Sequence, residues 1–481
     1  MQTHEQTSSP DGIKLRGNLG AGAIIFMVVA QAAPLTVMAA NTPLLISMGN
    51  GAAAPLDAAI AGLIMLFFAV GFTAMTPHIG NAGAFYAYVQ KGLGKVIGLG
   101  VGTLALISYF CILIALEAYF GFAASEFLRS YVGISIPWQL LAIAIVVIVC
   151  TLGYRHVELS AKFLGIALVL EISVVLLINL AIIFTHAGNG IDLTPVAPAT
   201  MLSGSPGLGI LFAIFSFMGF EATAVYREEA RNPDVTIPRA TYGSVILIGI
   251  FYVVSMWCEV VGVGTDKVTA FATEHPGDMY QLLAQQYVGS SVGEIMQVLL
   301  LTSLFACILS IHNVIVRYKY IFGRYGILPA ALSQVHSRHG SPHISSLTQS
   351  VMSLVSIVIM GILSLDPVTQ IYTWGATSGT VGYMAILALT CLSVIVYFSR
   401  FSSSEGIWSV KIAPFLGLIG VLGCLMVAII NLPSLVGGDN ANLVAEIMIA
   451  VNILAFALGA VAAAVMKSRS PARFNGLNEL A

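Results

Sequence analysis

The sequence predicts an all-α integral membrane protein with about twelve transmembrane helices. Of the 481 residues, 58% are hydrophobic and only 9% are charged, and the mean hydropathy is +0.93. An ordinary soluble domain has roughly 25% charged residues. Apolar stretches of about 20 residues, the length that crosses a bilayer, also follow one another along almost the whole chain. The distribution of basic residues supports the same arrangement independently.

Twelve apolar stretches are long enough to be membrane spans. They lie near 20–48, 55–77, 96–128, 136–153, 159–184, 207–227, 240–262, 292–322, 344–365, 370–398, 412–431 and 443–466. The first stretch is too long for a secretory signal peptide and has no clear small-residue cleavage site. We therefore expect one membrane domain in the lipid bilayer, with short polar tails before and after it.

Lysine and arginine fall almost entirely on one side of this arrangement. Basic residues in short loops collect on the cytoplasmic side of a membrane protein. Of the 20 Lys and Arg residues, only Arg129 and Lys267 are placed on the opposite side. The sequence thus predicts a multi-pass protein of the inner (plasma) membrane with both termini in the cytoplasm. The loop 266–286, between spans seven and eight, is expected outside.

Composition and motifs exclude several other functions. The formal net charge is −2 and the basic residues are spread over several loops, so no nucleic-acid-binding patch is expected. The six cysteines lie in or beside apolar spans and form no CxxC pair, which is typical of packing residues. No spacing typical of a catalytic triad, a metal site or a phosphate loop is present. We expect no enzyme activity, no catalytic residue, no metal and no cofactor, and the sequence does not require a partner subunit.

Two spans carry a potential helix break near the middle of the membrane. The first contains QAAPLT at 31–36, where Pro34 lacks a backbone donor and crowds the preceding turn. The sixth contains FMGFE at 217–221. Irregular backbone at this depth is tolerated only where it is buried in protein or lines a cavity. Breaks five spans apart are what an inverted five-plus-five repeat gives, with the substrate bound between them.

Several separated segments resemble short motifs of the amino acid-polyamine-organocation permeases. The segments are PHIGNAGAFYAY at 77–88, GFE at 219–221, EEARNP at 228–233, IPRA at 237–240, His-Asn at 312–313, Arg-Tyr at 317–318, GRYGILP at 323–329 and Ser-Pro at 341–342. The first is similar to the family's Pro-x-x-Gly-x-x-Gly-x-x-Tyr stretch after helix two. The others are similar to its sixth-helix signature with the following loop, and to the end of its eighth helix.

This resemblance implies a LeuT-type core in which broken helices one and six surround a central pocket. The implied domains are a cytoplasmic tail over 1–19, a ten-helix transport core over 20–400, two peripheral helices over 401–466 and a cytoplasmic tail over 467–481. The implied function is secondary transport by alternating access, and we expect an amino acid or related amine to be carried together with a proton. Exchange of substrate for product is the alternative. A channel or receptor is less favoured, because repeated filter loops and a signalling domain are both missing from the sequence.

One departure from the family pattern concerns helix one. Relatives commonly have a Gly-Ser-Gly type turn there, and its free N–H groups hold the substrate carboxylate. The matching positions here are Pro34, Leu35 and Thr36. Because proline has no N–H to donate, the sequence predicts recognition chiefly through the amine and side chain of the substrate.

The residues expected to line the pocket lie beside the two breaks and on helix three. They are Ala32, Ala33, Pro34, Leu35, Thr36, Tyr109, Phe215, Met218, Gly219 and Phe220. For each of them, the alternative is packing against neighbouring helices. His312, Asn313 and Arg317 are expected in an inner polar network or a cytoplasmic cap.

Acidic side chains inside a membrane are costly and therefore need a reason. Glu221 lies at the sixth-helix break and is expected either to gate the pocket or to cap the second half-helix. Glu171, in the middle of span five, is expected to carry the coupling proton or to be a neutral structural acid. Glu117, in span three, is expected to be structural or to face the substrate amine, whereas Glu259 is expected at the membrane interface. A sodium site between helices one and eight, with hydroxyls from Thr302 and Ser303, is the alternative to protons.

Overall fold

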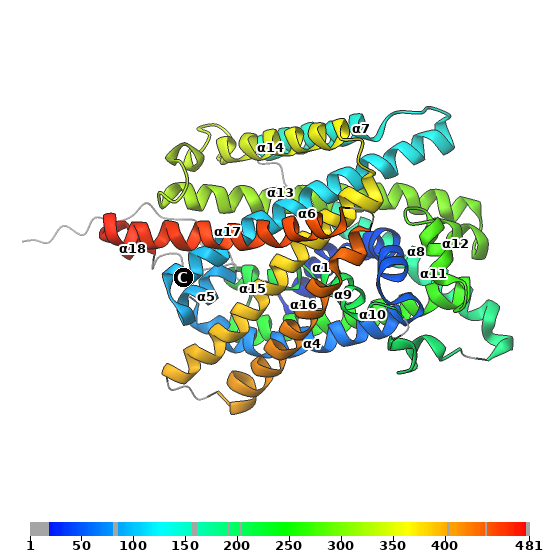
Figure 1. The fold of residues 1–481 in the computed structure, drawn as a ribbon, viewed down its shortest axis with the longest axis horizontal. Coiled ribbons are helices and arrows are strands. Elements are labelled where there is room, and N and C mark those ends of the chain that lie inside the picture. Colours follow the sequence, from blue (N-terminus) through cyan, green and yellow to red (C-terminus); the bar gives the residue numbers. More distant parts are fainter. Residues whose placement is uncertain are drawn as a thin grey trace, which may run out of the picture.

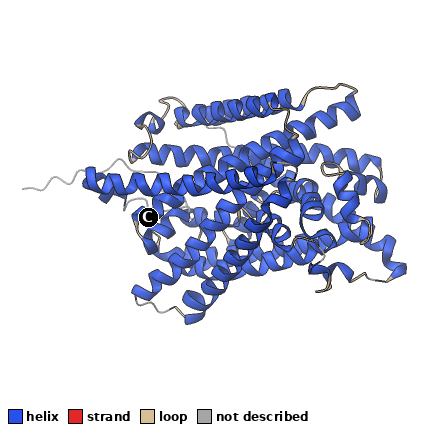
Figure 2. Ribbon diagram, viewed as in Figure 1, coloured by secondary structure: helices blue, strands red, loops and turns tan. Residues whose placement is uncertain are grey.

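The computed structural model describes residues 19–79, 85–155, 161–190, 192–202, 204–401, 405–437 and 440–477. All regular elements in these ranges are helices, apart from a single isolated bridge between Leu19 and Ala230 (Figures 1 and 2). The predicted tail 1–19 lies outside the described residues except for Leu19, and so do 80–84 of the segment after helix two.

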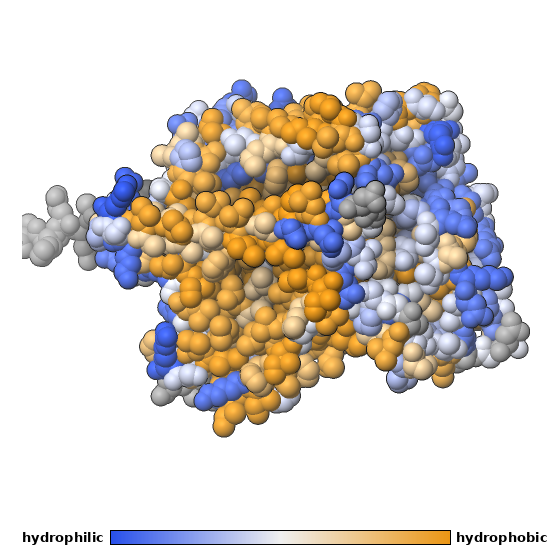
Figure 3. Space-filling view, in the orientation of Figure 1, coloured by the Kyte–Doolittle hydropathy of each residue, from blue (hydrophilic) through white to orange (hydrophobic). Residues whose placement is uncertain are grey.

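Ten helical stretches in the described chain are long and apolar enough to cross a membrane. The first stretch, Ala21–His78, contains both the first and the second predicted spans, and the 17-residue helix α7 (Trp138–Tyr154) accounts for the fourth. Figure 3 shows a continuous apolar band over the side of the bundle, with polar residues gathered at its two ends. The predicted all-helical membrane fold with about twelve spans is confirmed.

The helices agree with the predicted spans to within a few residues at most ends. The first span comprises α1 (Ala21–Gln31), α2 (Pro34–Thr36), η1 (Val37–Asn41), α3 (Thr42–Leu44) and η2 (Leu45–Asn50). The others are α4 (Ala54–Met75), α6 (Lys95–Phe127), α7, α8 (Ala161–His186), α9 (Pro206–Ser216) with η9 (Phe220–Glu229), α10 (Pro233–Val263), α13 (Ser290–Arg324), α14 (His343–Ile362), η11 (Pro367–Tyr372) with α15 (Thr373–Arg400), η12 (Trp408–Ile412) with α16 (Ala413–Val436), and α17 (Ala441–Arg469).

The largest difference lies at the start of the seventh span. Helix α10 begins at Pro233, well before the predicted start at 240, so the IPRA motif lies in its first turns. Proline at the first helical position loses no hydrogen bond, and Asp234 in the first turn complements the helix dipole. Polar residues extend this helix beyond the apolar stretch, which is why hydropathy alone places its start too late.

Four short α-helices of the described residues lie outside the spans. They are α5 (Phe85–Leu93), α11 (Val268–Glu274), α12 (Met279–Tyr287) and α18 (Pro471–Gly476). Helices α11 and α12 lie at one end of the bundle and α18 lies at the other (Figure 1).

The C-terminal segment is docked at its end of the bundle. The Lys95 Nζ donates to the carbonyls of Phe474 at 2.9 Å and Asn475 at 3.1 Å, and Gln90 Nε2 donates to the carbonyl of Leu477. A cation at a helix C-terminus is favourable because the free carbonyls there carry partial negative charge. Part of the expected polar tail 467–481 is therefore a packed helix.

The halves of spans one and six that lie toward α11 are tied to each other. Asn41 Nδ2 donates to the Phe212 carbonyl and to Ser216 Oγ, both at 2.8 Å. The backbones also approach closely, since a Cβ at Gly49 would lie 2.8 Å from the Cα of Gly209. These contacts hold the two half-helices together and fix where their broken ends meet.

Candidate substrate-binding site

The break in the first span lies at Ala32 and Ala33. Ala33 has a φ of 46°, in the left-handed region that non-glycine residues rarely adopt, and α2 starts at the next residue. Pro34 is the first residue of this new helix, where a missing N–H costs nothing. The break therefore lies within the predicted segment 31–36, in the turn that precedes Pro34.

The break in the sixth span lies between Ser216 and Phe220. Gly219 has a φ of 108°, which favours glycine. The N–H groups of Phe217 and Met218 bond to the carbonyls three residues earlier, which tightens the end of α9. The chain continues as the narrower 3₁₀ helix η9.

The two breaks face each other. A Cβ at Gly219 would lie 3.5 Å from Gln31 Cγ and 3.7 Å from the Ala32 nitrogen. The Ala32 carbonyl accepts a hydrogen bond from the Tyr252 hydroxyl at 3.4 Å. The structure thus brings together the two segments that the sequence marks as interrupted.

Glu221 is held at the break by three donors. Its Oε2 accepts from the Gly219 N–H at 2.9 Å and from the Tyr383 hydroxyl at 3.0 Å, and its Oε1 accepts from the Tyr109 hydroxyl at 3.2 Å. An acid in the first turn that accepts a free N–H satisfies an otherwise orphaned donor and suits the positive end of the helix. This geometry is that of a cap on η9, one of the two roles expected for Glu221.

Glu171 belongs to a separate cluster beside helix one. Its Oε2 accepts from Ser303 Oγ at 2.9 Å, and Ser303 Oγ accepts from Thr36 Oγ1 at 3.1 Å. This chain of hydroxyls links α8 and α13 to the first turn after the helix-one break. A cavity of about 20 Å³ adjoins it, lined by Ala30, Ala167, Leu168, Glu171, Thr302, Ser303 and Ala306. None of these lining residues is basic, and the volume suits about one water molecule or a small ion.

Glu117 lies away from the breaks. It is buried on α6, where its carboxylate contacts the Ser353 hydroxyl of α14. Two further polar contacts join α13 to the same face of α14: His312 to Ser346 at 3.0 Å, and Lys319 to Gln349 at 2.8 Å. The polar contacts of His312 thus belong to a row of hydrogen bonds between α13 and α14.

Glu259 is enclosed by protein at the end of α10 where a position at the membrane interface is expected. Its side chain is 0% exposed, although the residue lies near the end of α10. Helix α12 packs against this end and contributes Tyr280, which is also buried. The loop after α10 forms helices that cover Glu259. The position of Glu259 within its span does not predict that these helices bury it.

The residues predicted to line the pocket cluster around the breaks. Ala32, Ala33, Pro34, Leu35, Thr36, Gly219 and Phe220 are buried, whereas Tyr109, Phe215 and Met218 are partly buried. Aromatic rings close the α5 side of this region. The ring centroids of Tyr109 and Tyr318 are 6.2 Å apart, those of Tyr86 and Tyr318 are 5.7 Å apart, and those of Phe85 and Tyr383 are 5.8 Å apart.

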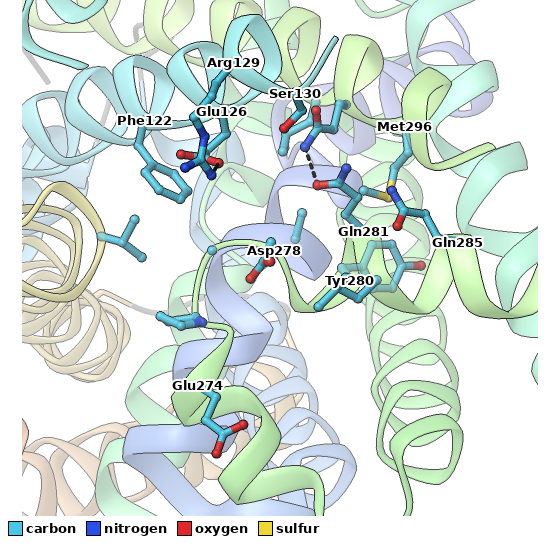
Figure 4. A pocket seen from close by; sticks show the side chains of 18 of the residues that line it. Phe122, Glu126, Arg129, Ser130, Glu274, Asp278, Tyr280, Gln281, Gln285 and Met296 are labelled. Atoms are coloured by element: carbon cyan, nitrogen blue, oxygen red, sulfur yellow. Dashed lines mark hydrogen bonds and ion pairs between the residues drawn. The ribbon is translucent and has the colours of Figure 1, made fainter. Parts of the chain in front are cut away.

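A larger cavity of about 440 Å³ lies at the opposite end, between α6, α12 and α13. Figure 4 shows Glu126, Arg129 and Ser130 on one side of it and Asp278, Gln281 and Gln285 on the other. Four acidic residues line it, against one arginine, which is paired with Glu126. The lining is therefore acidic on balance.

Two residues at the breaks are not among those predicted. Tyr383, on α15, donates a hydrogen bond to Glu221, and Gln31, at the end of α1, lies beside Gly219. The break motif at 31–36 includes Gln31, so its polar side chain beside a run of apolar residues is a signal that could have found it. Among the described residues, no group of three or more His, Cys, Asp or Glu side chains could hold a metal ion.

Comparison with known proteins identifies the family. Residues 23–470 match the model of the amino acid permease family. The chain is 24% identical over 391 residues to the branched-chain amino acid permease BcaP of Bacillus subtilis, covering 78% of this chain and 79% of that protein. It is 22% identical over 365 residues to the low-affinity putrescine importer PlaP of Escherichia coli, covering 74% and 77%. It is 20% identical over 385 residues to the serine/threonine exchanger SteT of Bacillus subtilis, covering 76% and 80%. With a family match over nearly its whole length and two facing breaks in the expected spans, the chain belongs to the amino acid permease family of the amino acid-polyamine-organocation superfamily.

Proposed function

We propose that this protein is a secondary carrier that moves an amino acid or a related amine by alternating access. The observation that carries the proposal is the meeting of the two helix breaks in a chain of this family. Broken helices leave backbone donors and acceptors free at the middle of the membrane, where a substrate can use them. Residues 20–400 would form the moving core, with 401–466 at its periphery.

The free groups at the breaks favour an amine over a carboxylate. Helices α1 and α9 both end at the breaks, so their last carbonyls carry partial negative charge there. Two helices, α2 and η9, also begin there. At the start of η9, however, the Gly219 N–H already donates to the Glu221 carboxylate. The remaining N-terminus begins with Pro34, which leaves the N–H groups of Leu35 and Thr36 as its first donors. Two helix C-termini thus meet at the site with only one helix N-terminus that Glu221 does not occupy.

Amines without a carboxylate are therefore expected to compete with amino acids. Purified protein in proteoliposomes would be tested for uptake of labelled L-leucine and putrescine, which match the substrate types named for two relatives, and of labelled γ-aminobutyrate. Excess unlabelled n-butylamine should lower the initial rate by at least half, whereas n-butanol should not. Inhibition by intact α-amino acids alone, with no effect of n-butylamine, would show that the site recognises the substrate mainly through its carboxylate.

We propose that a proton drives this transport and that Glu171 carries it. The support is its burial among hydroxyl groups, next to a cavity that has no basic lining residue. Sodium is the alternative ion, and the hydroxyls of Thr302 and Ser303 beside the cavity are the observation that favours it. Exchange is the alternative mode, because one relative is named an exchanger.

The proposed location is the plasma membrane, with both termini in the cytoplasm. In a cysteine-free background, Ser468→Cys on α17 should react with an impermeant maleimide only after the cells are permeabilised. Lys267→Cys, in the loop before α11, is the matched control and should react in intact cells. Labelling of the Ser468 variant in intact cells would invert the proposed orientation.

A further inference from the structure

Gln31 holds a polar side chain at the point where the two breaks meet. It is the last residue of α1, and its side chain lies alongside Gly219. Its Nε2 donates to Ser310 Oγ of α13 at 3.3 Å. This hydrogen bond uses the amide nitrogen of Gln31 and leaves the amide oxygen, Oε1, for a different partner.

The Oε1 atom of Gln31 is buried and has no hydrogen-bond partner among the described residues. Leaving a buried acceptor unsatisfied is costly, and buried polar groups in proteins nearly always have a partner. The neighbouring residues of the break, Ala32, Ala33, Pro34 and Leu35, have no polar side-chain atom that could serve. The partner of this oxygen is therefore expected from outside the chain.

We infer that Gln31 Oε1 is a specificity-determining acceptor for the ammonium group of the substrate. This inference rests on the proposed transport function. It names Gln31 as the residue of helix one that makes a polar side-chain contact with the substrate. A primary ammonium has three donors. One can bond to Oε1 and the others can bond to the carbonyls that end α1 and α9. Ser310 acts as the positioning residue that orients the amide.

Two substitutions at Gln31 test whether its amide accepts a hydrogen bond from the substrate or donates one to it. Gln31→Met keeps the length but removes the amide, whereas Gln31→Glu keeps an acceptor and removes the NH₂ group. Uptake of labelled L-leucine, γ-aminobutyrate and putrescine into proteoliposomes gives KM and the maximal rate for each. Gln139→Met, on α7 and away from the breaks, is the matched control, and size-exclusion chromatography checks that each variant is folded.

For the probes that the wild type takes up, Gln31→Met should raise KM about 10- to 100-fold, the range for one hydrogen bond to a charged group. The maximal rate should change less than KM. Gln31→Glu should bind the same probes within a few-fold of wild type, and Ser310→Ala should raise KM by less than Gln31→Met.

An unchanged KM in a folded Gln31→Met variant would overturn the inference while leaving the transport function intact. Equal damage from Gln31→Glu and Gln31→Met would also overturn it, because the amide would then act as a donor to a carboxylate. Absence of uptake of all three probes by the wild type would overturn the proposed function itself, and this inference with it.

Discussion

Replacing Gly219 by leucine is expected to abolish transport while leaving a folded, membrane-inserted protein. Gly219 has a φ of 108°, which costs a side-chain-bearing residue roughly 1–2 kcal/mol. Leucine would also extend from a Cβ that lies 3.5 Å from Gln31 Cγ and 3.7 Å from the Ala32 nitrogen. Its side chain would therefore fill the space between the two breaks, where we propose that the substrate binds. This backbone cost is smaller than the roughly 5–15 kcal/mol by which folded proteins are generally stable.

The measurement is initial uptake into proteoliposomes at matched protein density, with folding followed by size-exclusion chromatography. Uptake by Gly219→Leu should fall to background. Gly423→Leu is the matched control: Gly423 lies on the peripheral helix α16, where an added Cβ would meet no atom within 4 Å. Its uptake should equal that of wild type. A folded Gly219→Leu variant that transports at a near-normal rate would show that the sixth-helix break is not at the substrate.

The spans could be predicted from the sequence because the bilayer imposes one strong rule on them. A helix in lipid must be apolar over about 20 residues, so composition alone locates each one. The start of α10 at Pro233 and the packed helix α18 follow a different rule. Polar side chains and tertiary contacts stabilise those segments outside the apolar stretches, and hydropathy does not detect such contacts.

The breaks were only partly predictable. Glycine favours the left-handed backbone at Gly219, so residue type marks that position. Ala33 adopts a left-handed conformation against its own preference, and the surrounding packing holds it there. Pro34 marks the neighbourhood of the first break, but it does so as the start of the next helix.

The partners of the acidic residues could not be found from sequence. Glu221 is held by Tyr109 and Tyr383, which lie 112 and 162 residues away along the chain. Glu171 reaches Ser303 across 132 residues. No local spacing encodes such contacts, because they depend on how the helices pack. The sequence could name the acids, since charge inside a membrane is rare, but not the groups that hold them.

Replacing Glu171 by glutamine is expected to abolish proton-driven accumulation while preserving substrate exchange. Burial of a carboxylate without a cationic partner favours its protonated form, and the cavity beside Glu171 has no basic lining residue. Its carboxylate also connects through Ser303 to Thr36, in the first turn after the helix-one break. Loading or release of a proton would therefore alter a contact between helix one and its neighbours. Glutamine keeps the shape and accepts the Ser303 hydrogen bond, but it cannot titrate.

With one proton per substrate and the membrane potential clamped at zero, a gradient of one pH unit can drive about tenfold accumulation, since each unit is worth about 1.4 kcal/mol. Wild-type proteoliposomes, acidic outside, should approach this value, whereas Glu171→Gln should only equalise the two concentrations. Exchange of internal for external substrate should continue in the variant at a comparable rate. Glu446→Gln, an exposed acid on the peripheral helix α17, is the matched control and should accumulate like wild type. Accumulation by Glu171→Gln against the substrate gradient would exclude Glu171 as the coupling group, and accumulation that requires a sodium gradient would assign the cavity beside Thr302 and Ser303 to that ion.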